Sequence, residues 1–516
     1  MQTLSATLLA AQKAMGDILY KLVLTKAGED TITYGCDTTN RILDMKHWDD
    51  DWLQTVEVVI DDREGNVTSI NLIGYQGVVS YGYHTTSDEY IGQAPLKVKA
   101  QDLRYIDGDE VCVLSLTGKG NQMEEDKASA INKKGTATST SAKHLVDTAA
   151  TFESGDLGKK VYNSTDNTWA RVSAYVSGTD LVIEAVASQW VAVTAYIVGD
   201  KRKPTVENGS VYICSTAGTS GGSEPSWSTT DGATTSDGTV TWTCYNLIIS
   251  GESYELHATE HLANSSDTMK THINAIAGAT MPCFSHCEVI TVSWDVEDWL
   301  IDTYIPSDGF KVTPGQSRLE KIKEALAPTA CDGRIESDGY LHIFMTYARA
   351  WQANFNYYVG EIVKPITGGD FIYTCTTTGV SGSVEPTWTL GADDTITDNS
   401  VVWTLQYDYK YGRESDDHNI YQKSTIRRIV SPNKVIVHSY PDMEESYWGS
   451  ATEPDSYALL PKTVTQQMRL TSDTQAENIA KAMIDRLARN NATGQGRFPM
   501  NVGQEIYDYV LLAEED

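Results

Sequence analysis

The sequence predicts a mainly β protein with α+β parts, in which a larger body is interrupted by small β modules. Short runs of alternating apolar and polar residues recur along the chain and are separated by turn residues, as expected for many short strands. The composition agrees, with 28 Tyr, 12 Trp and 39 Gly beside 14 Pro. Two stretches of the chain also repeat each other, and each is only long enough for a small module.

Length and charge limit the number of domains and the classes of protein to which the chain can belong. The chain has 516 residues, which allows about three to five domains. Lys and Arg total 40 against 70 Asp and Glu, a net charge of −30. This charge excludes a general nucleic-acid binder and disfavours docking on an anionic membrane. The eight cysteines are too scattered for a disulfide scaffold, and we expect no membrane-spanning segment.

Residues 1–15 predict an N-terminal amphipathic helix. Leu4, Leu8, Ala11 and Met15 fall on one helical face. No basic residue precedes the short apolar stretch and no clean cleavage site follows it, so we expect no targeting segment.

Residues 16–133 predict a β-barrel-like domain. Alternating runs separated by turns are typical of a barrel or sandwich. A short helix is expected over residues 121–132. The expected strands cover residues 19–25, 54–62, 69–75, 76–83, 95–102 and 110–118.

The repeat joins residues 190–245 to residues 351–406 without a gap, at a constant offset of 161. The aromatic residues match in register, and Glu224-Pro225-x-Trp227 matches Glu385-Pro386-x-Trp388. We therefore expect two small β modules, at residues 188–247 and 351–409, each with three to five short strands. Cys214 and Cys244 are candidates for a disulfide, but the second copy has Leu405 in place of Cys244, so the fold does not depend on it.

This pattern of Trp, Tyr, Gly and E-P-x-W resembles the chitin-binding-like carbohydrate-binding modules of chitinases and phage tail proteins. Aromatic faces stack on sugar rings while polar neighbours bond the hydroxyls. The alternative is that these aromatics form the core of a module with little else to bury. Trp227 and Trp388 are the best candidates, because a Gly/Ser loop and a Pro precede them. The candidate carbohydrate-binding residues are Trp190, Tyr196, Tyr212, Trp227, Trp242, Trp351, Tyr357, Tyr373, Trp388 and Trp403.

A further inserted β module is expected at residues 134–187. Short β runs at 159–163, 170–176 and 180–185 alternate with turn residues. It resembles another small β module common in phage structural proteins.

Residues 248–350 predict an α+β domain. Ser266-Asp267 is suited to cap a helix that runs to Ala277. Ser317 and Glu320 have capping-box spacing for a second helix, with Pro328 as its stop. A hairpin is expected over residues 333–344.

Residues 410–516 predict a C-terminal β domain with a helix. A hairpin over residues 425–440 is expected to turn at 431–433, and a helix should run from Thr474 to Asn490. An extended segment, 505–510, follows.

The order of these elements resembles the baseplate or tail-tip hub proteins of tailed bacteriophages. Residues 332–344 and 476–510 carry most of the resemblance, and the inserted modules are typical of phage tail proteins. It implies a structural virion protein at the tail tip, made in the host cytoplasm. It implies a homotrimer, in which two β-barrel-like domains per subunit form a ring around a channel.

The implied partners are distal tail or tube proteins, the tape-measure protein and tip or fibre proteins, with host-surface glycans for the modules. DNA would meet the protein only in transit, and an acidic lumen would let it slide. We expect no enzyme activity, no catalytic residue, no metal and no cofactor. The alternative function is a secreted or surface polysaccharide-binding protein.

A remote alternative is a zinc-dependent hydrolase, because residues 257–261 read H-x-x-E-H. That chemistry needs both histidines on one helical face, whereas residues 253–257 read as a strand. Cys283, His286 and Cys287, with Cys331, are a weak zinc set for which small buried hydrophobes are the simpler interpretation. The acidic clusters at 49–51 and 294–299 lack the glycine-turn spacing of a calcium loop.

Overall fold

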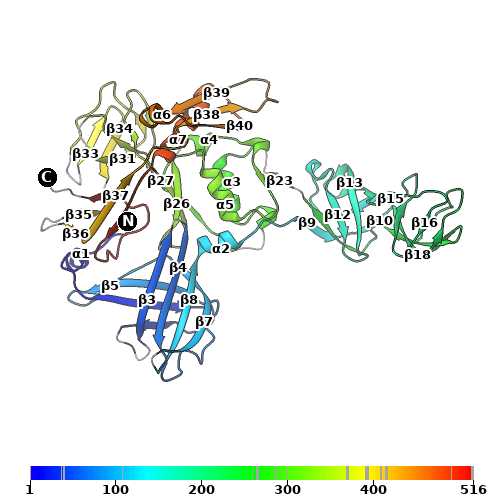
Figure 1. Ribbon diagram of the computed structural model, residues 1–516, viewed down its shortest axis with the longest axis horizontal. Helices are drawn as coiled ribbons and strands as arrows, with labels where there is room; N and C mark the ends of the chain where they lie inside the picture. The colour runs from blue at the N-terminus through cyan, green and yellow to red at the C-terminus, as the bar shows by residue number, and fades with distance from the viewer. Residues whose placement is uncertain are drawn as a thin grey trace.

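The computed structural model is mainly β, and the α-helices of its described residues lie in the body. The body occupies one side of the molecule, and two small modules project from it in a row (Figure 1). The structure describes residues 2–36, 38, 41–50, 52–106, 108–258, 260–262, 266–284, 288–297, 299–367, 371–389, 394–406, 409–412, 417–489 and 491–512.

An antiparallel sheet forms the lower part of the body (Figure 1). Its strand order is β2-β1-β5-β7-β8-β4-β3, with β6 paired to β5. Helix α1 (Ala6–Lys13) is capped by Ser5 and packs Leu8 into the core of this sheet. The strands are β1 (Ile18–Thr25), β2 (Ile32–Gly35), β3 (Ile42–Asp50), β4 (Leu53–Asp61), β5 (Gln76–His84), β6 (Asp88–Gly92), β7 (Leu96–Ile106) and β8 (Asp109–Gly118).

One expected strand of this sheet, residues 69–75, is wrong. The segment is a series of turns that leads into β5. A side chain and the end of β7 hold its backbone. Gln101 accepts from the Leu72 amide at 3.0 Å and donates to the Ile70 carbonyl at 3.0 Å, and Val98 bonds the Gly74 amide and the Tyr75 carbonyl at 3.0 and 2.9 Å. Side-chain bonds of this kind satisfy a turn that still buries an apolar residue, here Leu72.

The next module, named here the β module, is larger than expected. A single seven-stranded sheet in the order β10-β11-β14-β13-β12-β22-β9 includes strands on both sides of the first repeat. The first repeat copy is therefore nested inside the β module, between β14 and β22. The strands are β9 (Ile131–Thr136), β10 (Ser139–Ser141), β11 (His144–Val146), β12 (Lys160–Asn163), β13 (Thr168–Ser177), β14 (Asp180–Ala185) and β22 (Ser253–His257).

The two repeat copies, named here aromatic module 1 (188–246) and aromatic module 2 (349–406), fold alike. Each has a five-stranded sheet and a two-stranded one. Module 1 contains β15 (Ser188–Gln189), β16 (Ala195–Tyr196), β17 (Lys201–Lys203), β18 (Ser210–Thr216), β19 (Gly218–Thr219), β20 (Thr234–Asp237) and β21 (Val240–Asn246). Module 2 contains β28 (Arg349–Ala350), β29 (Asn356–Tyr357), β30 (Ile362–Lys364), β31 (Ile372–Thr377), β32 (Gly379–Val380), β33 (Thr395–Asp398) and β34 (Val401–Gln406).

The middle of the body is α+β. The capping box of α5 (Arg318–Leu326) is present, with Ser317 and Glu320 bonding each other's backbone amides. Helix α3 (Met269–Ala277) is capped by Thr268 instead of Ser266 or Asp267. The expected hairpin is β26 (Cys331–Ile335) with β27 (Leu341–Met345). The other elements are α2 (Lys119–Glu125), β23 (His261–Leu262), β24 (Val292–Trp294), α4 (Trp299–Thr303) and β25 (Lys311–Val312).

The described residues of the C-terminal part form three small sheets. The hairpin expected over residues 425–440 is wrong, because β37 (Gln422–Arg427) pairs with β41 (Ala492–Arg497) and β38 (Lys434–Ser439) pairs with two other strands. Helix α7 (Asp473–Arg489) lies close to the expected range. The remaining elements are β35 (Tyr409–Gly412), β36 (His418–Asn419), β39 (Trp448–Thr452), α6 (Pro454–Leu459), β40 (Thr463–Met468) and β42 (Val510–Leu512).

The body is one unit although the chain enters it three times. Its largest core joins Trp52 from the first part, Ile322 from the middle part and Ile479 from the last. The core of the lower sheet also contains Val502, near the opposite end of the sequence from Leu8. The modules interrupt the sequence of the body without dividing its core.

The two aromatic modules relate to the body differently. Ile362 of module 2 is buried in the body core, and a Cβ on Gly360 would lie 2.3 Å from the Asp295 carbonyl oxygen. At the same offset, module 1 has exposed Lys201 and a Gly199 with open space around it. Module 2 is thus seated on the body, whereas the same face of module 1 is open.

Candidate functional site

The repeat is a structural repeat down to its strand register. In module 1, Tyr212 lies opposite Cys244 and Cys214 opposite Trp242. In module 2 the equivalent pairs and the same β-bulge recur 161 residues later. Cys214 and Cys244 are both buried free thiols, so the disulfide considered from the sequence is not formed.

A buried carboxylate organises the core of each module. Asp237 Oδ2 accepts from Trp190 Nε1 at 2.7 Å and from Trp242 Nε1 at 3.1 Å. Asp237 Oδ1 accepts from the Gly221 amide at 2.7 Å. Asp398 makes the same three bonds in module 2, at 2.8, 3.3 and 2.7 Å. Neither aspartate is among the candidates predicted from the sequence, although the two match at the repeat offset.

Eight of the ten candidate aromatics lie in these cores. Their side chains are covered by protein, so no ring face is available to a sugar. The hydroxyls are also used: Tyr212 donates to the Ser228 carbonyl at 2.8 Å, and Tyr373 to the Thr389 carbonyl at 2.9 Å. The eight are Trp190, Tyr196, Tyr212, Trp242, Trp351, Tyr357, Tyr373 and Trp403.

Trp227 and Trp388 are the two candidates that remain partly exposed. Trp227 packs on Tyr212 at a centroid distance of 4.2 Å, and its Nε1 donates to Glu224 at 2.9 Å. Trp388 packs on Tyr373 at 4.4 Å and donates to Glu385 at 3.0 Å. Burial raises the pKa of Glu224, but hydrogen bonds from Thr205 and Trp227 outweigh it and hold that pKa below its usual range. The E-P-x-W motif therefore fixes one indole at the surface of each module.

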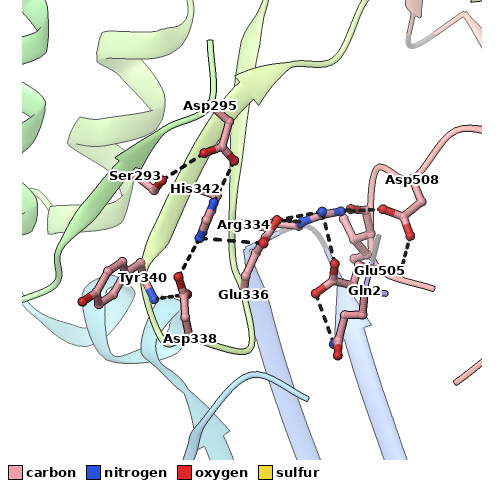
Figure 2. A network of polar contacts seen from close by, with 11 residues as sticks. Gln2, Ser293, Asp295, Arg334, Glu336, Asp338, Tyr340, His342, Glu505 and Asp508 are labelled. Atoms are coloured by element: carbon pink, nitrogen blue, oxygen red, sulfur yellow. Dashed lines mark hydrogen bonds and ion pairs between the residues drawn. The ribbon is translucent and has the colours of Figure 1, made fainter. Parts of the chain in front are cut away.

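A second polar site ties the parts of the body together (Figure 2). Arg334 on β26 bonds Glu336 at 2.7 Å, Glu505 at 3.2 Å and Asp508 at 2.9 Å. The side chain of Gln2 in turn donates to Glu505 at 3.4 Å. This network, named here the Arg334 joint, links the middle part of the body to both the C-terminal and the N-terminal parts.

His342 on β27 adjoins the Arg334 joint (Figure 2). Its Nδ1 lies 2.7 Å from Asp295 and its Nε2 lies 3.1 Å from Asp338. Hydrogen bonding to Asp295 is the main cause that raises the pKa of His342 to about 9. Asp295, Glu336 and His342 are close enough to hold a metal ion. Both ring nitrogens of His342 already bond carboxylates, so a metal ion would have to replace one of these bonds.

Neither a family model nor a curated protein matches this sequence. Three of the solved structures similar to the chain are tail proteins. The tail protein from Neisseria meningitidis MC58 has 9% identity and a TM-score of 0.40, over 96% of this chain and 86% of that one. The 43 kDa tail protein of prophage MuSo2 from Shewanella oneidensis has 10% identity and a TM-score of 0.35, over 96% and 89%. Prophage tail protein gp18 from Listeria monocytogenes EGD-e has 10% identity and a TM-score of 0.23, over 70% and 79%.

The H-x-x-E-H residues do not form the peptidase arrangement. His257 ends β22, whereas His261 lies on β23 and its Nε2 is 2.6 Å from the Ser129 carbonyl oxygen. Glu260 pairs with Lys311 at 3.3 Å. The motif is therefore divided between two strands instead of sharing one helical face, as the strand interpretation of residues 253–257 predicts.

Some of the other candidate metal ligands lie outside the described residues. Cys283 and Cys331 are buried, while His286 and Cys287 lie outside the described residues. Of the acidic clusters, Asp51 and Asp298 also lie outside them. Within the described part of the chain, no helix has the length and apolar character to cross a membrane.

Because His342 is protonated in the folded body, the stability of the body should decrease as the pH becomes alkaline. Its pKa rises from 6.5 to about 9 on folding, so its contribution is complete below pH 6.5 and is lost as the pH passes about 9. We expect the free energy of unfolding to fall by roughly 2–3 kcal/mol between pH 6.5 and 10 from this group. Urea unfolding across this range measures it, and His342→Gln should flatten the difference. An equal slope in the variant contradicts the assignment.

Proposed function

We propose that this chain is a structural protein of a phage tail, the hub of the tail tip. In this proposal it joins the tail tube to the distal tip and surrounds the exit channel. The observation that carries the proposal is the body itself. Three separate stretches of chain share one core and meet at the Arg334 joint, while the inserted modules leave that core undivided. This is the arrangement of a load-carrying scaffold that displays accessory modules.

The assembly follows from this proposal. Three copies form a ring, bound by tube and distal tail proteins on one side and by tip or fibre proteins on the other. The tape-measure protein and DNA pass through the lumen. The net charge of −30 supports transit of DNA without retention. The role is structural, and no step of it requires a catalytic residue, a metal or a cofactor.

The mass and shape of the purified chain test the proposal. We expect light scattering to give a trimer and negative-stain images to show a ring with peripheral knobs. A monomer that does not form rings on addition of the tail-tube protein would overturn the hub, and would favour the alternative of a surface polysaccharide-binding protein.

Removing aromatic module 1 should leave the ring intact. Residues 188–246 are nested in the β module and contribute nothing to the two cores of the body. We expect the chain with these residues replaced by a short Gly-Ser linker to form the same oligomer as wild type. The matched deletion of residues 349–406 should impair assembly, because it removes Ile362 from the body core. Loss of the ring in both deletions contradicts the inserted-module description.

We also propose that the modules bind host-surface glycans through Trp227 and Trp388. The two indoles hold the same place in both copies, each fixed by its own glutamate. The double variant Trp227→Phe, Trp388→Phe should bind insoluble chitin or peptidoglycan several-fold more weakly than wild type in a pull-down. Trp448→Phe, at an exposed indole of the body, is the control. If the double variant and the wild type were retained equally, Trp227 and Trp388 would not be the residues that bind the glycan.

A further inference from the structure

We propose that the exposed face of the β module binds an anionic glycan, one whose sugars carry carboxylate or phosphate groups. The site lies on β12, β13 and β22, on the side of the sheet turned away from the module core. It contains none of the candidate residues of the aromatic modules. If this face bound no glycan, the proposal that the chain is the hub of a tail tip would therefore be unaffected.

The strand register places six side chains in a two-by-three grid. Lys160 on β12 lies opposite Arg171 on β13 and opposite His257 on β22. Two residues along β12, Tyr162 lies opposite Trp169 and Glu255. Directly opposed residues share one face of a sheet, about 5 Å apart. The six side chains therefore form one continuous surface.

The other face of the same strands fixes which side is exposed. Val161 on β12, Ala170 on β13 and Leu256 on β22 alternate with the grid residues and lie in the module core. Because side chains alternate along a strand, the grid must point outward. It is a preformed surface on a rigid sheet, not a loop that must become ordered on binding.

The grid has an aromatic platform at one end. Trp169 is 38% exposed, and its ring lies 4.7 Å from that of Tyr162 and 5.1 Å from that of His257. The Tyr162 hydroxyl donates to Asn167 at 2.6 Å, which holds its ring in place. A flat exposed indole with a second ring beside it presents an apolar face suited to the C–H side of a pyranose.

The charged side chains around the platform select an anion. Lys133 and Lys159 of this module pair with Asp156, and Lys133 also pairs with Glu153, whereas no ion pair among the described residues involves Lys160 or Arg171. A further cation, Lys201 of aromatic module 1, donates to the Asn167 carbonyl at 3.4 Å beside the platform. The register also places Glu184 on β14 opposite Arg171 and Lys134 on β9 opposite Glu255. The cations Lys134, Lys160, Arg171 and Lys201 thus outnumber Glu184 and Glu255, and such an excess on a chain of net charge −30 is an electrostatic recognition feature.

Together these groups define the occupant. The indole and phenol offer stacking, Glu255 offers an acceptor for sugar hydroxyls, and Lys160 with Arg171 offer charge-assisted bonds to a carboxylate or phosphate. A neutral glycan would use the platform but leave both cations without a partner. A protein or peptide would need a larger apolar patch than one indole supplies.

Binding of defined oligosaccharides to the full-length chain tests the inference. The probes are hexagalacturonate for carboxylates, poly(glycerol phosphate) teichoic acid for phosphates, and cellohexaose as the neutral reference. Titration calorimetry should give at least one anionic probe an affinity about tenfold above the neutral one. Trp169→Ala should weaken that binding about tenfold, and Lys160→Gln with Arg171→Gln should remove the preference for the anion.

Two controls separate this site from the rest of the molecule. Trp448→Ala, at an indole 62% exposed on the body, should change the affinity less than twofold. The double variant Trp227→Phe, Trp388→Phe should bind the anionic probe like wild type. The inference is overturned if wild type binds neither anionic probe, if cellohexaose binds as tightly, or if Trp169→Ala binds like wild type while its thermal melting is unchanged.

Discussion

Replacing Asp237 by alanine should unfold aromatic module 1 and leave the body folded. The change removes the common acceptor of Trp190 Nε1, Trp242 Nε1 and the Gly221 amide, all within the module core. A buried donor left without a partner costs about 1–3 kcal/mol, so three cost about 3–9 kcal/mol. A module of this size has a total stability of about 3–8 kcal/mol. Limited proteolysis should therefore cut within residues 188–246 first.

Two further variants test this prediction by comparison. Ser223→Ala changes an exposed loop residue of the same module and should leave its protease resistance unchanged. Asp398→Ala removes the equivalent acceptor in module 2, and there the damage should spread, because Ile362 is part of the body core. If Asp237→Ala leaves residues 188–246 as resistant as in wild type, the carboxylate does not organise the module.

Replacing Arg334 by alanine should detach the C-terminal segment from the body. The guanidinium is 12% exposed and holds Glu505 and Asp508, whose side chains are 11% and 2% exposed. Removing one partner of a buried ion pair leaves the other charge uncompensated and costs about 3–5 kcal/mol. Hydrogen exchange should show loss of protection in β42 and in β35, its parallel partner.

The control for Arg334 is an arginine in an exposed pair. Arg104 bonds Asp102 at 2.8 Å with both side chains at least half exposed, so Arg104→Ala should leave the unfolding curve unchanged. Arg334→Lys keeps the positive charge but loses the paired N–H donors of the guanidinium. It should therefore reduce the protection from hydrogen exchange less than Arg334→Ala does. Unchanged exchange of residues 509–512 in Arg334→Ala would show that the joint does not hold the segment.

Local signals in the sequence predicted much of the fold. The capping box at Ser317 and the apolar periodicity of α7 depend on residues within a few positions of each other, and both are found where expected. The repeat was visible because its two copies keep one offset over their whole length. The capping box and the helical periodicity are features that a short window of sequence contains.

The failures involve partners that are distant in sequence. β37 pairs with β41 across 65 or more residues, and no local pattern distinguishes that partner from the adjacent β38. β9 and β22 are separated by an entire module, so the β module was predicted without these two strands at one edge of its sheet. Alternation identifies a strand and its faces, but not its neighbour.

For the candidate site, the sequence identified the aromatics but not their exposure. Trp190 and Trp227 belong to the same motif, yet one bonds a buried aspartate and the other a surface glutamate. Tyr162 and Trp169, the exposed aromatic pair, each lie on a strand in which residues facing the core alternate with residues facing outward. Their cross-strand partnership could be seen only once the register was known.

The nesting of the modules also sets an order for synthesis on the ribosome. Module 1 has all of its strands once residue 246 has emerged, whereas β9 must wait for β22 and Leu8 must wait for Val502. Domains usually mature from the N-terminus as the chain lengthens. Here the innermost insert is completed first and the lower sheet of the body last, so the body can finish folding only when nearly the whole chain has been made.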